Sequence, residues 1–254
     1  MFTDTHTHMD SKSFNEDCHE ALMRAYDNGV TRIINVGFNR ETIPSTLKLC
    51  ADYDFVYAAV GWHPQDAKDM TAADLEELEQ LCKLPKVVAI GEIGLDYYWD
   101  TSPKDVQQRV FREQIRLAKR LSMPIVIHNR EAHQDILTIL REENAAEVGG
   151  VMHCFSGSWE TAKACLDMNF HISFGGPITF KNAVQPKEVL ARVPLHRLLI
   201  ETDAPYLTPH PYRGKRNETG YVKLVAEAAA EIKGISVEEL ARATTQNAIF
   251  LFGL

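Results

Sequence analysis

Short apolar segments rich in Val and Ile recur along the chain, and they are separated by longer stretches whose apolar residues lie three and four positions apart. This alternation is typical of repeated βα units around a parallel sheet, whose strands are buried on both faces. The segments predict strands at 2–6, 31–36, 55–60, 87–92, 124–128, 150–153, 170–174 and 198–201. Eight strands alternating with helices over 254 residues fit the usual length of a closed (β/α)8 barrel.

The stretches between the strands read as amphipathic outer helices. In one of them Val106, Val110 and Leu117 follow helical spacing among Arg, Glu and Gln, and near the carboxyl terminus Ser236 and Glu239 form a capping-box pair. No linker, low-complexity segment or internal repeat divides the sequence. We therefore expect an α/β fold, a single-domain (β/α)8 TIM barrel over residues 1–254.

Composition limits the class of protein. The chain has no apolar run near the roughly 20 residues that span a bilayer, and acidic Asp4 stands where a secretory signal would carry basic residues, so we expect a cytoplasmic protein without membrane contact. Its five cysteines include no Cys-x-x-Cys pair, which argues against a disulfide framework or a thiolate zinc site. A net charge of −8 argues against binding nucleic acid by bulk attraction, although bound cations would still offer a phosphate a local site.

Metal-competent side chains follow the predicted strands. In a (β/α)8 barrel the carboxyl ends of the strands form the rim that holds the active site, so residues at these ends converge. The residues in these positions are His6, His8, His63, Glu92, His128, His153 and Asp203.

The pair His6 and His8 in "TDTHTHMD" has a physical reason for its spacing. Residues i and i+2 of a strand point to the same side, so both imidazoles can reach one ion. The alternative is a pair of exposed histidines at the end of a strand. Buried polar side chains at the ends of "VVAIGE", "PIVIH" and "GGVMH" would be costly without partners, and one or two cations would serve them all.

Ligands with nitrogen and oxygen donors and no sulfur suit divalent cations such as Mg2+, Mn2+ or Zn2+. The set is too large for one tetrahedral ion with an open position. It favours two ions bridged by a carboxylate, an arrangement that serves hydrolysis because it acidifies water and stabilises developing charge.

Eight strings, taken in order, resemble the TatD family of metal-dependent deoxyribonucleases within the amidohydrolase superfamily. They are "DTHTH", "GWHP", "GEIGLDYY", "IHNR", "MHCFSG", "ISFGGPITFKNA", "LLIETDAPYLTP" and "PYRGKRNE", and together they cover almost the whole chain. The chain departs from the family pattern at Glu131, where many relatives have Asp, and at Thr219, where they often have Pro. Neither position is a proposed ligand.

The resemblance implies a (β/α)8 barrel and assigns roles to individual residues. His6, His8 and Asp203 would hold one ion, and His128 and His153 would hold a second. Glu92 would bridge the two ions, and Asp203 would also orient the attacking water or accept its proton.

Further residues are candidates for substrate contact. His63 is either a polar residue in a turn or a substrate contact at the rim, and Arg130 is either a surface residue or a planar fork for a phosphate oxygen. In "YRGKRNE", Arg213 and Lys215 are candidates for holding a nucleic-acid backbone. Arg216 in the same loop and Lys181 in "TFKNA" are weaker candidates.

Three features near the rim have alternative readings. Glu201 is either a positioning partner for a ligand histidine or a charge at a strand end. Tyr97, Tyr98 and Trp99 either stack on bases or pack a loop. We reject Cys154 as a nucleophile, because strand alternation would turn it away from the site if His153 points inward.

The sequence thus predicts a metal-dependent phosphodiesterase that acts on DNA, as an exonuclease if the usual activity of the family applies, with RNA or another phosphodiester also possible. One alternative keeps the site but hydrolyses an ester, amide or lactone. The other is a barrel without enzymatic activity, which missing ligands would favour, and no ligand is missing.

Overall fold

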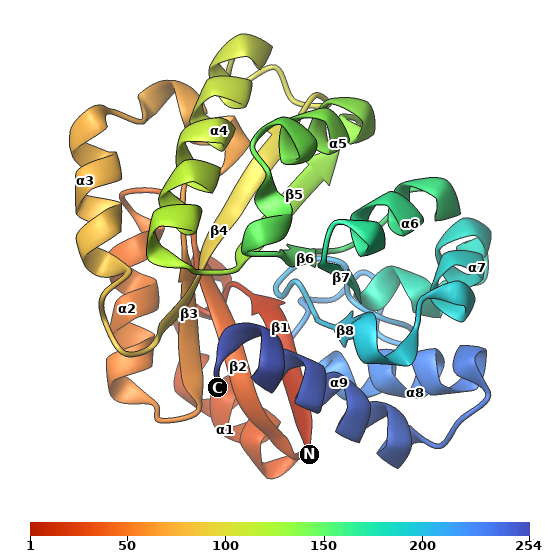
Figure 1. Ribbon diagram of the computed structural model, residues 1–254. Helices are drawn as coiled ribbons and strands as arrows, with labels where there is room; N and C mark the ends of the chain where they lie inside the picture. Colours follow the sequence, from red (N-terminus) through yellow and green to blue (C-terminus); the bar gives the residue numbers. More distant parts are fainter.

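Eight parallel strands form one sheet in which each strand pairs with its neighbour in sequence, from β1 to β8 (Figure 1). The computed structural model describes residues 1–254. Beyond β8, the Asp203 N–H donates to the His6 carbonyl at 2.9 Å, and the His8 N–H donates to the Ala204 carbonyl at 2.8 Å. These bonds bring the two edges of the sheet together at the carboxyl end of the barrel. The strands are β1 Phe2–Thr7, β2 Val30–Gly37, β3 Val56–Val60, β4 Val87–Asp96, β5 Ile125–Arg130, β6 Gly150–Met152, β7 Phe170–Phe174 and β8 Leu198–Ile200.

Helices surround the barrel and cover the outer face of the sheet (Figure 1). In α4, for example, Val110, Phe111 and Ile115 are buried while the opposite face carries charged residues. None of the helices is long and apolar enough to cross a membrane. The helices are α1 Cys18–Asp27, α2 Thr42–Asp52, α3 Ala72–Leu81, α4 Lys104–Leu121, α5 His133–Glu142, α6 Trp159–Asp167, α7 Val184–Arg192, α8 Val222–Lys233 and α9 Val237–Phe252.

All eight predicted strands and the (β/α)8 barrel are confirmed, but some strand ends differ. The main difference is β4, which continues beyond Glu92 to Asp96 and pairs with β5 along this extension. Gly94 makes this pairing possible, since its φ is +145° and a Cβ there would lie 2.0 Å from the His128 carbonyl oxygen. A glycine inside a strand weakens the sequence pattern, so the prediction stopped too early.

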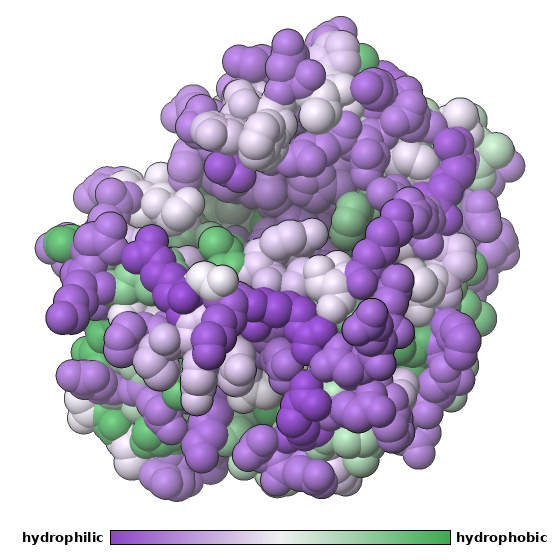
Figure 2. Space-filling model, turned by 180° about the vertical axis from the view of Figure 1, so that it is seen from behind, coloured by the Kyte–Doolittle hydropathy of each residue, from purple (hydrophilic) through white to green (hydrophobic).

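The two ends of the barrel differ in what fills them. Helix α9 covers the end of the barrel where the strands begin. Its Asn247 side chain donates a hydrogen bond to the Leu198 carbonyl at the start of β8, and its Thr245 hydroxyl accepts one from the Thr3 hydroxyl in β1. Ala248 and Phe252 of α9 join an apolar cluster inside the barrel. The face turned away from the view of Figure 1 is mainly hydrophilic, with scattered apolar residues and a hollow in its upper half (Figure 2).

Candidate metal centre

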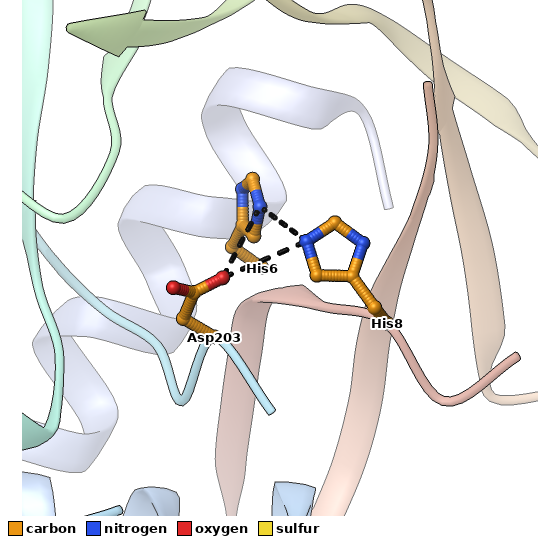
Figure 3. Close-up of side chains that lie close together, drawn as sticks. All are labelled: His6, His8 and Asp203. Carbon is orange, nitrogen blue, oxygen red and sulfur yellow. Dashed lines mark hydrogen bonds and ion pairs between the residues drawn. The ribbon is translucent and has the colours of Figure 1, made fainter. Parts of the chain in front are cut away.

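His6, His8 and Asp203 converge at the carboxyl rim, where the end of β1 meets the segment after β8 (Figure 3). The Nε2 atoms of the two histidines are 3.3 Å apart. Asp203 Oδ1 lies 3.8 Å from His6 Nε2 and 3.6 Å from His8 Nε2. One carboxylate oxygen of Glu92, Oε2, faces this group at 3.3 Å from His6 Nε2. We call His6, His8 and Asp203 the first ligand group.

The other carboxylate oxygen of Glu92 faces a second set of imidazoles. Glu92 Oε1 lies 2.7 Å from His128 Nδ1, 2.8 Å from His153 Nε2 and 3.7 Å from His63 Nε2. His128 belongs to β5, His153 follows β6 and His63 follows β3. We call His128 and His153 the second ligand group. A carboxylate that offers one oxygen to each of two groups has the geometry of a bridge between two cations.

Hydrogen bonds on the outer side of the imidazoles set which nitrogen faces inward. His8 Nδ1 lies 3.0 Å from the Val36 carbonyl oxygen, which can only accept a hydrogen bond, so this nitrogen carries the proton. His153 Nδ1 donates in the same way to Glu201 Oε1 at 3.2 Å. The inner Nε2 atoms then face carboxylates, His8 Nε2 at 3.6 Å from Asp203 Oδ1 and His153 Nε2 at 2.8 Å from Glu92 Oε1. Once these nitrogens lose their protons, their lone pairs and the carboxylate oxygens are donors that fit a divalent metal.

The pKa values of the rim residues decide which of them are charged when a metal binds. Burial alone would raise the pKa of Glu92, but the adjacent His153 and His6 outweigh it and hold the pKa well below its usual value. The pKa of Asp203 is likewise lowered, because the contact with His8 outweighs the cost of burial. Burial and the nearby His153 lower the pKa of His6. At neutral pH the rim therefore presents two carboxylates and a neutral His6. Burial alone would lower the pKa values of His8, His128 and His153, but their contacts with carboxylates outweigh it and raise them, so a bound cation would displace protons from these rings.

Known proteins resemble this chain over its whole length. The model of the TatD related DNase family matches residues 3–253. The uncharacterized metal-dependent hydrolase YabD of Bacillus subtilis (strain 168) is 57% identical over 252 residues, which cover 99% of either chain. The chain belongs to the TatD family.

Two further relatives extend the comparison to Escherichia coli. The uncharacterized metal-dependent hydrolase YcfH of strain K12 is 42% identical to this TatD protein over 258 residues, which cover 99% of this chain and 96% of YcfH. The crystal structure of YjjV, a TatD homolog from E. coli K12, has a TM-score of 0.94 at 34% identity and covers 100% of this chain and 98% of its own.

Asp96 adjoins the second ligand group in this TatD protein, and the sequence reasoning missed it. Its Oδ2 accepts hydrogen bonds from His128 Nε2 at 3.0 Å and from Gln65 Nε2 at 3.1 Å. These bonds outweigh burial and lower the pKa of Asp96. The only sequence signal was its even spacing from Glu92 in "GEIGLD", which becomes informative once β4 is known to reach Asp96.

Asp4 is a second residue that the sequence reasoning did not place at the site. It is fully buried, and it accepts hydrogen bonds from the Thr202 N–H at 2.9 Å and from Thr219 Oγ1 at 2.6 Å. Burial raises its pKa to about 7. Asp4 lies two residues before His6, so the i, i+2 rule that related His6 to His8 would also have found it.

The structure gives His63 and Arg130 different surroundings. His63 Nδ1 accepts the Gln65 N–H at 3.1 Å, so its Nε2 carries a proton and points toward Glu92. Burial lowers the pKa of His63 to about 3, and the ring is therefore neutral. Arg130 is exposed at the end of β5, where its guanidinium stacks 3.9 Å from the centre of the Tyr98 ring.

The basic loop after β8 divides into two parts. Arg213 and Lys215 are exposed, and Arg213 lies 4.4 Å from the centre of the Phe180 ring. Arg216 instead donates to Asp17 Oδ1 at 2.6 Å and to Glu218 Oε1 at 2.9 Å. Arg216 therefore ties this loop to the start of α1 and is engaged within the protein.

Glu201 and Cys154 lie together behind His153. Glu201 is fully buried, and its Oε1 accepts both His153 Nδ1 and the Cys154 N–H, the latter at 2.6 Å. Strand alternation does not orient Cys154, because β6 ends at Met152 and Cys154 has a φ of +42°. The pKa of its thiol is raised well above the usual value, first by burial and then by neighbouring carboxylates. A protonated thiol is a weak nucleophile, so our rejection of Cys154 rests on this reason instead.

Proposed function

We propose that this TatD-family metal-dependent hydrolase cleaves phosphodiester bonds in DNA and works inward from a strand end. The observation that carries the proposal is the Glu92 carboxylate, whose two oxygens face the two ligand groups at the rim. The match to the TatD related DNase family supports DNA as the substrate.

The proposed ligand assignment follows the two groups. His6, His8 and Asp203 would hold one cation, His128 and His153 would hold the other, and Glu92 would be shared by both. Mg2+, Mn2+ and Zn2+ all suit these nitrogen and oxygen donors. When bound, the cations supply Lewis acidity and neutralise charge that develops on the phosphoryl group.

Asp203 is the proposed proton acceptor. Its lowered pKa keeps it ionised at neutral pH, and its side chain, 14% exposed, can still be reached from solvent. A water molecule that hydrogen-bonds to Asp203 is held on the side of the first ligand group. Asp203 orients this water for attack on phosphorus and takes up the proton that it releases.

His63 and Arg130 are the proposed phosphate contacts closest to the ligand groups. The neutral His63 ring presents its Nε2–H to the site, so it donates a hydrogen bond to a phosphate oxygen. The side chain of Arg130 forms no hydrogen bond or ion pair within the chain, and stacking on Tyr98 holds its guanidinium in place. Its N–H groups remain available for a second phosphate oxygen. Arg213 and Lys215 extend this positive surface along the backbone of the strand.

The decisive test is degradation of end-labelled linear DNA with Mg2+, Mn2+ or Zn2+. We expect the wild-type protein to degrade it and the His6→Ala and Asp203→Ala variants to be inactive. His19→Ala is the matched control, because His19 is an exposed histidine on α1 away from the rim, and this variant should retain full activity. Degradation that persists in both rim variants would contradict the proposal. Resistance of a closed circular strand would establish the requirement for an end.

Charge reversal separates a nuclease from a hydrolase of small esters or lactones. The double variant Arg213→Glu, Lys215→Glu should bind DNA more weakly, and its binding should depend less steeply on salt, because fewer cations are displaced from the backbone. Hydrolysis of a small ester would hardly respond to these changes. Unchanged DNA binding in the double variant would remove the basic loop from the proposal.

A further inference from the structure

Large aromatic side chains stand exposed on the two loops that follow β4 and β8. Tyr98 is 50% exposed and Trp99 is 48% exposed on the first loop, and Tyr206 is 57% exposed on the second. Tyr97 differs from its neighbours, because it is half-buried and its hydroxyl donates to Asp135 Oδ2 at 2.7 Å. The exposed parts of these rings, beside a candidate active site, are available to stack on a ligand.

Tyr206 stands beside the first ligand group. Its ring centre lies 6.2 Å from that of His8, and its N–H donates to the Asp203 carbonyl at 2.8 Å. Its own carbonyl accepts Asn217 Nδ2 at 2.6 Å, so the backbone of this loop is held at two points. The ring is therefore exposed on a fixed support next to two proposed ligands.

Tyr98 and Trp99 stand beside the second ligand group. Asp96 Oδ1 accepts both of their backbone N–H groups, at 3.1 and 3.2 Å, while Oδ2 of the same carboxylate contacts His128. The two rings meet edge to face with centres 4.8 Å apart, and Arg130 covers one face of Tyr98. A single buried carboxylate thus fixes both the aromatic pair and a proposed ligand.

The order of the strands places these aromatic groups across the site from each other. In an eight-stranded barrel with the order β1 to β8, the ends of β4 and β8 lie on opposite sides of the rim. Glu92 and the two ligand groups lie between them. A phosphodiester bound between the two ligand groups would therefore have an aromatic surface on either side.

We infer that Tyr206 and the Tyr98–Trp99 pair hold the nucleobases that flank the scissile phosphate, and that they set a preference for diesters carrying such bases. This inference rests on the proposed function. Base stacking on aromatic side chains tolerates any sequence, since every base has a π face. The two surfaces would thus select for nucleotides without reading their order, while simple alkyl diesters would gain nothing from them.

The test compares two oligonucleotides that differ only in the bases flanking one defined cleavage site, which are present in one and replaced by abasic residues in the other. For the normal oligonucleotide, Tyr206→Ala and Trp99→Ala should each raise KM by about tenfold while kcat changes by less than about twofold. Tyr206→Phe should keep the wild-type KM, because it retains the ring. The abasic oligonucleotide should show the raised KM already with the wild-type protein and should not respond to the alanine variants.

Binding measurements keep this inference separable from the proposed function. Fluorescence anisotropy in an Asp203→Asn background with Mn2+ reports affinity without turnover. Phe250→Ala, which removes an exposed aromatic ring from α9 at the other end of the barrel, is the matched control and should not change affinity. Normal DNA that binds better than abasic DNA but is never cleaved by the wild-type protein would overturn the nuclease and support the base contacts. The base contacts would be overturned if the protein bound both oligonucleotides with equal affinity. They would also be overturned if the alanine variants lost the same affinity for the abasic oligonucleotide as for the normal one.

Discussion

The two ends of this barrel are built from the same eight strands but filled with opposite chemistry. Where the strands begin, Phe252 and Ala248 of α9 pack against apolar side chains such as Ile34 and Val126. Where the strands end, Glu92 is 4% exposed among imidazoles, and His6 is fully buried with no hydrogen-bond partner for its Nδ1. Burial of an ionised carboxylate is unfavourable unless cations or donors surround it.

This difference teaches that stability and chemistry are assigned to opposite ends of the barrel. The apolar end gains free energy from burial and requires no ligand. The polar rim is arranged around charges that its own residues do not fully balance, which suits it to bind cations and a phosphate. The same division is general in (β/α)8 enzymes. Substitutions at the two ends should therefore affect different measurements.

The largest effect is expected at the centre of the rim. Glu92→Gln removes the charge of the proposed bridge, and DNA cleavage should fall by at least about a thousandfold because neither proposed cation would keep its shared ligand. Metal content, measured by mass spectrometry after gel filtration, should fall with it. Circular dichroism would check that the barrel is still folded. Full metal content in Glu92→Gln would break the proposed bridge.

The next effect is expected at the apolar end. Phe252→Ala should lower the free energy of unfolding by about 3 kcal/mol, because it leaves a cavity under α9. Chemical denaturation would measure this loss, and DNA cleavage per folded molecule should stay at the wild-type level. Phe250→Ala on the same helix is the control, since Phe250 is 80% exposed and its loss should leave stability unchanged. A parallel loss of activity in Phe252→Ala would contradict the separation of the two ends.

A smaller effect is expected one layer behind the ligands. Glu201→Gln weakens the acceptor that orients His153, and metal affinity should fall by about tenfold to a hundredfold. Competitive titration with a fluorescent chelator would measure it. Glu147→Gln, at an exposed carboxylate outside the rim, is the matched control. Unchanged affinity in Glu201→Gln would show that His153 needs no such support.

The smallest effect is expected where ion pairs join the rim loops. The pKa of Asp17 is lowered to about 2, chiefly by its hydrogen bond from Arg216. Because this pKa lies below the unfolded value of about 3.9, the pair stabilises the fold above about pH 4 and is lost as the pH falls toward 2. As the pH falls from about 4 to about 2, the free energy of unfolding of the wild-type protein should drop by up to about 1 kcal/mol more than that of Arg216→Gln. The difference is small because solvent screens the pair. Lys215→Gln, beside it in the loop, should behave like the wild-type protein.

Much of the fold could be predicted because burial leaves a direct trace in the sequence. Strands buried on both faces appear as short apolar runs, so all eight were found along with the barrel. The end of β4 was missed because Gly94 and Asp96 do not resemble a strand in isolation. Only the pairing with β5 explains why a glycine and a buried carboxylate belong there.

The candidate site was predicted unevenly for a similar reason. His6, Glu92 and Asp203 were found from their position at strand ends together with a family resemblance. Tyr206 and Asp96 were not found, because each matters only through a neighbour that is distant in sequence. Tyr206 lies beside His8, and Asp96 contacts His128. Arg216 could not be told from Arg213 by sequence, since only the position of Asp17 distinguishes them.

The sequence by itself determined which residues are buried in strands and which polar residues follow them, because apolar periodicity and residue chemistry are local properties. The tertiary structure alone decided that the two oxygens of Glu92 face different imidazole groups, and that aromatic rings on the loops after β4 and β8 stand on opposite sides of them. These relations join strands far apart in the chain, and the closure of the barrel sets their distances.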